Sequence, residues 1–111
     1  MLKVKRVYEK PLKSDGMRIL VDRLWPRGLT KQKASIDFWM KDAAPSNALR
    51  KWFNHDPKRW GEFRSRYLGE LRASGQLDVL KRRAKGKVTL VYAAKDKEHN
   101  NAVALKSFLE K

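Results

Sequence analysis

The chain has 111 residues, a formal net charge of +15 and no cysteine, and it is 41% hydrophobic and 35% charged. This balance predicts one folded domain over residues 1–111 and excludes a disordered chain, a second domain, disulfides, thiolate metal sites and cysteine nucleophiles. No apolar run is long enough to span a membrane, and residues 1–10 lack the apolar core of a signal peptide, so we expect a cytoplasmic protein without a membrane partner.

The N-terminal quarter predicts two strands joined by a polar loop. Residues 2–8 alternate apolar and basic side chains, which is typical of a half-exposed strand at a sheet edge. Residues 9–16 contain Pro, Ser, Asp and Gly and predict the loop, and residues 17–22 are an apolar run that predicts a buried strand. That strand cannot continue through Pro26, which lacks an amide hydrogen, and Gly28 favours a turn.

Three short elements follow. Thr30 is placed to cap a short helix over residues 31–35. Residues 36–40, "IDFWM", predict a strand, although a helical turn fits them almost as well. Ser46 is expected to cap a helix with one apolar face. That face consists of Leu49, Trp52 and Phe53.

The longest predicted helix begins at Asp56 and Pro57, a typical N-cap and first helical residue, and ends at Gly75. Its apolar stripe consists of Trp60, Phe63, Tyr67 and Leu71. The stripe is interleaved with Arg59, Arg64 and Arg66. Aromatic and basic residues together can form a nucleic-acid platform, but the helical spacing favours a core face, with the arginines free on the opposite face.

The C-terminal part predicts a helix, a strand and a helix. Residues 76–86 form a shorter helix that ends at Gly86. Its inward positions are Leu77 and Leu80. Residues 87–94 are a continuous apolar run, as in a strand buried on both faces. The last helix is expected from about 97 to 110, where the inward positions are Ala102, Leu105 and Leu109.

Strands that alternate with helices predict an α/β fold with a small, largely parallel sheet of three or four strands and flanking helices. In such folds functional groups gather beyond the carboxyl ends of the strands. Two polar segments occupy that position, residues 22–28 and residues 94–101. We therefore expect these distant segments to meet at one edge of the sheet.

The segment "AKDKEHNN" holds the first candidate site. Asp96 is expected to be the N-cap of the last helix, with His99 and Asn100 in its first turn. A helix start with unpaired amide hydrogens suits an anion, so Asp96 and Asn100 are candidate ligand-binding residues and His99 a candidate catalytic residue. The plain alternative is a capped helix start, in which Asp96 is the cap, Glu98 complements the helix dipole, and Asn100 and Asn101 lie at the surface.

The segment "VDRLWPRG" holds the second candidate site. Asp22 is expected to orient Arg23 or Arg27, and either guanidinium can bind a phosphate or carboxylate through two hydrogen bonds. Trp25 either stacks on a planar ligand or, as we prefer, belongs to the core. The alternative for the arginines is an internal ion pair with Asp22.

His55 is a third candidate, because an imidazole can transfer protons near neutral pH, although it also fits a residue that only precedes the Asp56 cap. The spacing of His55 and His99 does not support a metal site. The chain contains neither a nucleophile elbow nor a phosphate-binding glycine loop, and no cofactor is indicated.

Four sequence blocks, "VDRLWPRGL", "HDPKRW", "VYAAKD" and "EHNNA", give the chain a specific likeness over nearly its whole length. The chain resembles the YeaO-like bacterial family, a group of domains of unknown function. The resemblance implies a small, single-domain, cytoplasmic protein and brings no established activity.

The positive charge is densest over residues 57–85, which contain nine Lys or Arg and three Asp or Glu. Such a field favours anionic partners, although a plainly solvated surface explains it equally well. We predict a domain that binds a small anionic ligand through Arg23 and Arg27, with catalysis by His99, Asp22 and His55 left open. The alternatives are a non-specific nucleic-acid-binding module that uses the basic helices at 57–85, and an interaction protein whose charge is incidental.

Overall fold

The computed structural model describes residues 2–110 and contains a single sheet of four parallel strands in the order β1-β4-β2-β3. The strands are β1 (Leu2–Arg6), β2 (Met17–Leu20), β3 (Phe38–Trp39) and β4 (Val88–Tyr92). The helices are α1 (Lys31–Ala34), α2 (Asn47–Phe53), α3 (Trp60–Ser74), α4 (Gln76–Arg83) and α5 (Asn101–Leu109). The predicted α/β class is confirmed, and β1 lies at the edge of the sheet as its sequence pattern indicates.

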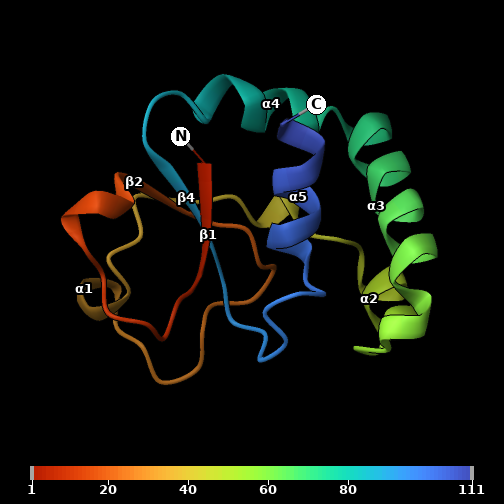
Figure 1. Ribbon diagram of the computed structural model, residues 1–111, viewed down its shortest axis with the longest axis horizontal. Helices are drawn as coiled ribbons and strands as arrows, with labels where there is room; N and C mark the ends of the chain where they lie inside the picture. Colours follow the sequence, from red (N-terminus) through yellow and green to blue (C-terminus); the bar gives the residue numbers. More distant parts are fainter. Residues whose placement is uncertain (1, 111) are drawn as a thin grey trace.

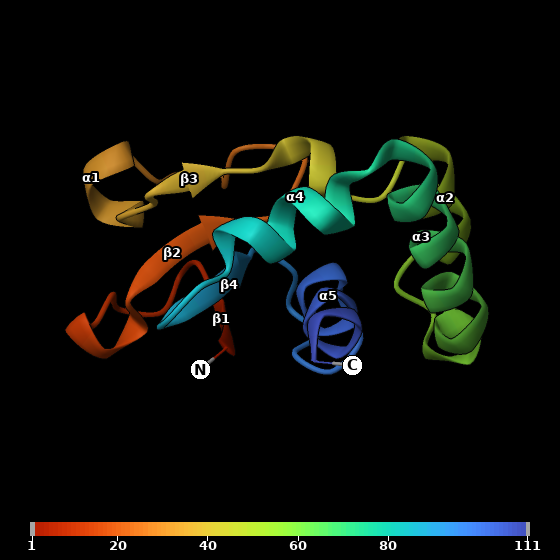
Figure 2. The same ribbon diagram turned by 90° about the horizontal axis from the view of Figure 1, so that it is seen from above.

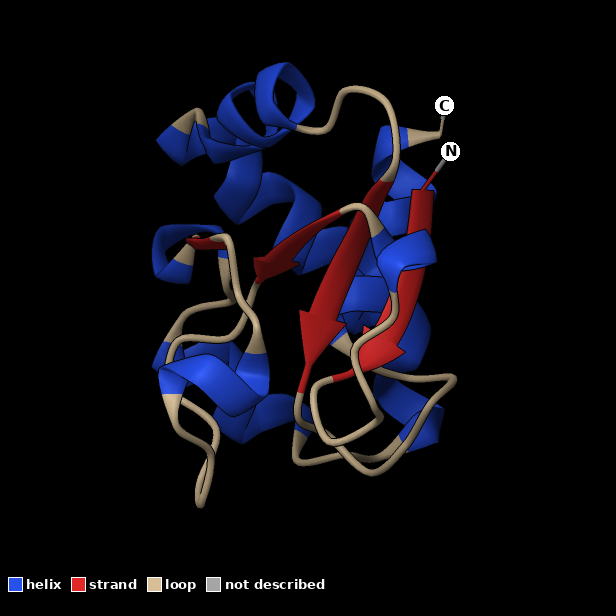
Figure 3. Ribbon diagram, turned by 90° about the vertical axis from the view of Figure 1, so that its left-hand side faces the viewer, coloured by secondary structure: helices blue, strands red, loops and turns tan. Residues whose placement is uncertain are grey.

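Helices cover both faces of the sheet, but unequally. Figure 1 shows α1 on one side of the strands, α2, α3 and α5 on the other, and α4 at the top. Figure 2 shows the same layers from above, with α4 between the strands and α3. Figure 3 shows the strands side by side. The polar loops that leave β2 and β4 therefore emerge at the same edge of the sheet.

Strand β4 is buried along its whole length, because it lies in the middle of the sheet. Leu90 and Tyr92 face the larger core beneath α2–α5, whereas Val91 faces the smaller core beneath α1. On the neighbouring strand β2, Ile19 and Leu20 divide between the same two cores. The alternation follows from the two-residue period of a strand, and it confirms the predicted strand buried on both faces.

The local start signals in the sequence are confirmed at α1 and α2, whereas α3 begins at Trp60 and not at Pro57. Thr30 and Ser46 cap α1 and α2, and their hydroxyl oxygens accept hydrogen bonds of 3.1 Å from backbone N–H groups three residues later. Asp56 caps a short 3₁₀ turn, Pro57–Arg59, that leads directly into α3. The predicted end of α4 at Gly86 is wrong: the helix ends at Arg83, because Ala84 leaves the helical conformation with φ −84° and ψ 58°.

The expectation for the inward face of α5 is partly wrong. Ala102 and Leu105 are fully buried, as predicted, but Phe108 is also buried and Leu109 is only partly buried. The ring of Phe108 packs edge-on against Tyr67 of α3, with 6.0 Å between the ring centroids. Packing against a neighbouring helix, which periodicity alone does not reveal, therefore sets the rotation of α5.

A buried carboxylate holds the amino ends of the strands together on the face that α1 covers. Asp15 has no solvent exposure and accepts hydrogen bonds from Arg18 Nη1 at 2.7 Å and from Lys5 Nζ at 3.1 Å. Arg18 is itself buried, and its other guanidinium nitrogens donate to the backbone oxygens of Ala34 and Ser35 at the end of α1. This network joins β1, the loop before β2 and the end of α1 to one another.

Candidate functional site

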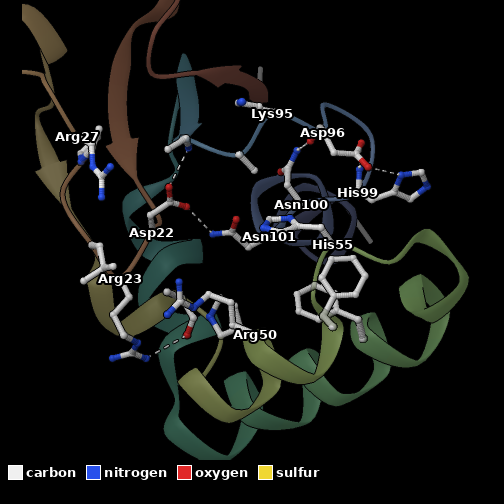
Figure 4. Close-up of a pocket in the computed structure, with 18 of the residues that line it drawn as sticks. Asp22, Arg23, Arg27, Arg50, His55, Lys95, Asp96, His99, Asn100 and Asn101 are labelled. Carbon is white, nitrogen blue, oxygen red and sulfur yellow. Dashed lines mark hydrogen bonds and ion pairs between the residues drawn. The ribbon is translucent and has the colours of Figure 1, made fainter.

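A cavity of about 650 Å³ opens beyond the carboxyl ends of β2 and β4. Its size is typical of small-molecule sites in proteins. Loops after three strands supply much of its wall, and α2 and α3 close one side (Figure 4). The lining residues are Tyr8, Asp22, Arg23, Leu24, Trp25, Pro26, Arg27, Ala44, Pro45, Arg50, Phe53, His55, Phe63, Ala93, Ala94, Lys95, Asp96, His99, Asn100 and Asn101.

All eight residues singled out from the sequence line this one cavity. They come from three separate segments, residues 22–27, 55 and 96–100. As expected, segments that are distant in the sequence therefore lie together at the carboxyl edge of the sheet. The chemical roles assigned to the eight residues stay predictions.

Asp22 lies where β2 leaves the sheet, and it does not orient Arg23 or Arg27, contrary to the prediction. Its Oδ2 accepts a hydrogen bond of 2.8 Å from the backbone N–H of Ala93, and its Oδ1 accepts one of 3.0 Å from Asn101 Nδ2. Burial raises the pKa of the Asp22 carboxyl, and these two hydrogen bonds and the charge of Arg50 offset part of that rise. The carboxylate thus links the ends of β2 and β4 to the start of α5.

The loop between β4 and α5 differs from the prediction at its cap. Asn100, not Asp96, is the N-cap of α5: its Oδ1 accepts a hydrogen bond of 2.9 Å from Val103 N–H. Asp96 Oδ1 instead accepts the backbone N–H groups of Glu98 and His99 within the loop. His99 and Asn100 consequently precede the helix and do not lie in its first turn.

His99 is held at the rim of the cavity by two neighbours. Its Nδ1 lies 3.0 Å from Asp96 Oδ2, and its ring meets Trp60 edge-on, with 5.4 Å between the centroids. Hydrogen bonds from Glu98 and His99 hold the pKa of the Asp96 carboxyl below its ordinary value, although burial opposes the change. The imidazole is therefore fixed beside a charged carboxylate, with Nε2 as its remaining polar atom (Figure 4).

Four cations line the cavity, and none of the ion pairs found among residues 2–110 includes one of them. They are Arg23, Arg27, Arg50 and Lys95. Arg23 makes only a long hydrogen bond of 3.5 Å to the Ala44 carbonyl, and its buried Nε has no hydrogen-bond partner. Since two carboxylates also line the cavity, its formal charge is +2 with both histidines neutral. The wall is therefore suited to an anion.

Arg50, Lys95 and Asn101 are lining residues that sequence reasoning missed. Arg50 belongs to α2, whose capping motif was recognised only as a structural signal. Asn101 is the first residue of α5, and its Nδ2 donates both to the Val21 carbonyl and to Asp22. The adjacent pair of asparagines was the available signal, because asparagine is a poor helix former and needs a reason at such a position.

Trp25 is partly buried: it packs against the smaller core, and it also lines the cavity. Its indole Nε1 donates a hydrogen bond of 2.7 Å to the Leu29 carbonyl, and its ring packs edge-on against Trp39 at 5.5 Å. Both contacts fix the indole, so any ligand meets a rigid apolar surface at Trp25.

His55 lines the cavity in a backbone conformation that is uncommon for residues other than glycine. Its φ is +55°, and the preceding Asn54, the C-cap of α2, has a φ of +47°. An isolated left-handed residue costs about 1–2 kcal/mol, and glycine adopts this region freely. A strained residue in a cavity wall is consistent with a functional imidazole.

Replacing His55 with glycine should therefore leave the free energy of unfolding unchanged or raise it by up to about 1 kcal/mol, because relief of the strain outweighs the greater flexibility of glycine in the unfolded chain. Urea denaturation of both proteins measures the difference. A loss of more than 1 kcal/mol would mean that the imidazole stabilises the fold, for example through its contact with Phe53.

We expected the arginines Arg64 and Arg66 to be free on the outer face of α3, but both make contacts within the protein. Arg66 pairs with Glu62 and lies over the ring of Trp52, 4.4 Å from the centroid. Arg64 donates a hydrogen bond of 2.8 Å to Ser107 of α5. These contacts occupy part of the basic surface that a nucleic acid would need.

Within the described part of the chain, no cluster of three or more His, Asp or Glu residues could hold a metal ion. Among residues 2–110 no helix is both long and apolar enough to cross a membrane.

Comparison with known proteins identifies relatives over the full length of the chain. The family model described as "Inactive DUF488-N3 subclade" matches residues 1–111. The uncharacterized protein Rv3073c of Mycobacterium tuberculosis is 41% identical over 109 residues, which cover 97% of this chain and 92% of the relative. The uncharacterized protein YeaO of Escherichia coli is 41% identical over 113 residues, with 97% and 96% covered. No solved structure matches significantly. The chain therefore belongs to the YeaO-like family of domains of unknown function, in the group described as the inactive DUF488-N3 subclade.

Proposed function

We propose that this protein binds a small organic anion in the cavity at the carboxyl edge of the sheet. The observation that carries the proposal is the set of four cations, Arg23, Arg27, Arg50 and Lys95, that line one cavity without a carboxylate partner among the described residues. Five Lys or Arg side chains elsewhere in residues 2–110 pair with carboxylates and most others do not, so what distinguishes these four is that they surround one cavity. Cations that line a cavity without carboxylate partners favour the binding of an anion that can form ion pairs with them.

The apolar part of the cavity wall favours a ligand that carries an organic group beside its negative charge. Apolar side chains such as Phe53 and Pro45 also line the cavity, and a volume of about 650 Å³ is larger than inorganic phosphate needs. Burial of an apolar group against these walls would add affinity at roughly 25 cal/mol per Å². An organic phosphate or carboxylate therefore fits better than a simple ion.

Binding without turnover is the form of the proposal that we favour. The family description contains the word "inactive". Two protein hydrogen bonds fix Asp22, and Asp96 orients His99 through Nδ1, which leaves Nε2 of His99 facing a ligand. In this proposal Asp22, His55 and His99 contact the ligand and do not transform it.

Calorimetric titration with phenyl phosphate and benzoate at pH 7.5 tests the proposal. We expect phenyl phosphate to bind, and Arg50→Gln to weaken it by about tenfold or more, because a hydrogen bond to a charged group contributes about 1.5–3 kcal/mol. Arg82→Gln, an exposed arginine of α4 outside the cavity, is the matched control and should bind like the wild type. Equal losses in the two variants, or no binding of either anion by the wild type, would refute a specific cavity site.

The basic segment 57–85, with its nine Lys or Arg against three Asp or Glu, is the observation that favours non-specific nucleic-acid binding as the second candidate. Salt separates the two candidates. Duplex DNA that is held by surface cations should dissociate steeply with salt, with a log–log slope near −0.9 per neutralised phosphate, whereas phenyl phosphate in a cavity should depend weakly on salt.

A further inference from the structure

Asp22 is a fixed acceptor inside an otherwise cationic cavity. Three protein elements hold it: Ala93 N–H donates to Oδ2, Asn101 Nδ2 donates to Oδ1, and Trp39 Nε1 donates to its backbone oxygen at 2.8 Å. The residue is partly exposed and lines the cavity. Its position and direction are therefore set before any ligand enters (Figure 4).

The Asp22 carboxylate has acceptor capacity that the protein does not use. An ionised carboxylate offers about four lone-pair positions, and the structure gives one hydrogen bond to each of its two oxygens. No ion pair among residues 2–110 includes Asp22, although Arg50 is near enough to influence its charge. A ligand that fills the cavity without a donor would leave this partly buried carboxylate poorly solvated, which is unfavourable.

A hydroxyl group would suit Asp22 better than an ammonium group. A ligand ammonium would enter a cavity lined by four cations, and only two carboxylates would oppose them. One of these two, Asp96, is already occupied by His99 and by two backbone N–H groups. A neutral hydroxyl donates to Asp22 without that repulsion.

We propose that the ligand is a hydroxylated organic phosphate of the sugar-phosphate class, whose phosphate meets the arginines and whose hydroxyl donates to Asp22. The inference rests on the proposed function and names the class of ligand for the same cavity. A phosphate monoester carries between one and a half and two negative charges at neutral pH, which matches the formal +2 of the cavity wall better than the single charge of a carboxylate does.

The test compares two phosphates of similar size, ribose 5-phosphate and cyclopentylmethyl phosphate, which lacks hydroxyl groups. We expect the wild type to bind ribose 5-phosphate about tenfold more tightly, although the second compound is more apolar, because it leaves Asp22 without a donor. In Asp22→Asn the preference should fall to about threefold or less, because the acceptor is then neutral, and Asp42→Asn, an exposed carboxylate outside the cavity, should keep the full preference.

Each outcome of this titration separates the two proposals. Equal or tighter binding of cyclopentylmethyl phosphate by the wild type overturns the hydroxyl contact and leaves anion binding standing. Tighter binding of ribonate, the hydroxylated carboxylate, overturns the phosphate assignment. If ribose 5-phosphate, cyclopentylmethyl phosphate and ribonate all fail to bind, the proposed function fails as well. Should Asp22→Asn not fold, the wild-type comparison alone decides.

Discussion

Replacing Arg27 and Arg50 together with glutamine should weaken the binding of phenyl phosphate at least a hundredfold and leave the fold as stable as before. Each guanidinium is expected to contribute about tenfold or more through charge-assisted hydrogen bonds, and both side chains line the cavity from exposed positions. Neither takes part in an ion pair among residues 2–110, so the free energy of unfolding should change by no more than about 0.5 kcal/mol.

Calorimetry and urea denaturation together check this expectation. A double variant of Arg82→Gln and Lys85→Gln removes the same charge from exposed positions outside the cavity and is the control. If the control loses affinity to the same extent, the anion is attracted by the overall charge of +15 and not by the cavity. If the cavity variant unfolds more easily, the two arginines have a structural role that their contacts do not indicate.

Replacing Asp15 with asparagine should lower the free energy of unfolding at pH 7 by about 3–5 kcal/mol. Asp15 and the Arg18 side chain are almost completely excluded from water, with 0% and 4% of their side-chain surfaces exposed. Loss of the carboxylate leaves a buried guanidinium uncompensated, and Lys5 loses its ion-pair partner. Because domains of this size are stable by only about 5–15 kcal/mol, the variant should be close to unfolding.

The dependence on pH distinguishes the ion pair from a loss of packing. Burial alone would raise the pKa of Asp15, but hydrogen bonds from the Leu12 N–H and from the Lys5, Arg18 and Lys3 side chains hold it well below its ordinary value. A carboxylate with a depressed pKa stabilises the fold above its unfolded-state pKa of about 3.9, and this stabilisation is lost as the pH falls below that value. The wild type should therefore lose stability between about pH 4 and pH 2 more steeply than Asp15→Asn. A variant that unfolds with the same steepness, or that loses less than 1 kcal/mol at pH 7, contradicts the assignment.

Local signals in the sequence predicted most of the elements but not the network at Asp15. Thr30, Ser46 and Asp56 each act within three residues of their own position, so a linear pattern contains all the information. Asp15 is different, because its backbone oxygen accepts a hydrogen bond from Thr89, which is 74 residues away. In the sequence Asp15 reads as a turn residue, and only the paired strands reveal that it is buried.

The N-cap of α5 shows a second limit, since aspartate and asparagine are nearly equal as caps. Asn100 also donates from Nδ2 to the Asp96 carbonyl at 2.9 Å while its Oδ1 caps the helix. An amide can donate and accept at once, whereas a carboxylate only accepts. The choice therefore depended on the path of the loop, which the sequence pattern does not specify.

The candidate site was predictable as a location more than as a set of contacts. The rule that loops meet at the carboxyl edge of a parallel sheet placed Asp22 and His99 in one cavity. It did not provide the partner of Asp22, because Asn101 reaches it from a helix 79 residues later. It also missed Arg50, which joins the cavity only through the packing of α2 against α3.

The order of the strands has a consequence for biosynthesis. β4 is the last strand to be made, yet it lies between β1 and β2 and forms parallel pairs with both. While the ribosome is still adding residues before Val88, β1 and β2 have no common neighbour, and the hollow that should receive the anion has no second wall. Such long-range pairing slows folding and leaves strand edges open to other chains. A nascent polypeptide of this kind can complete its sheet only after residues 88–92 have left the ribosome.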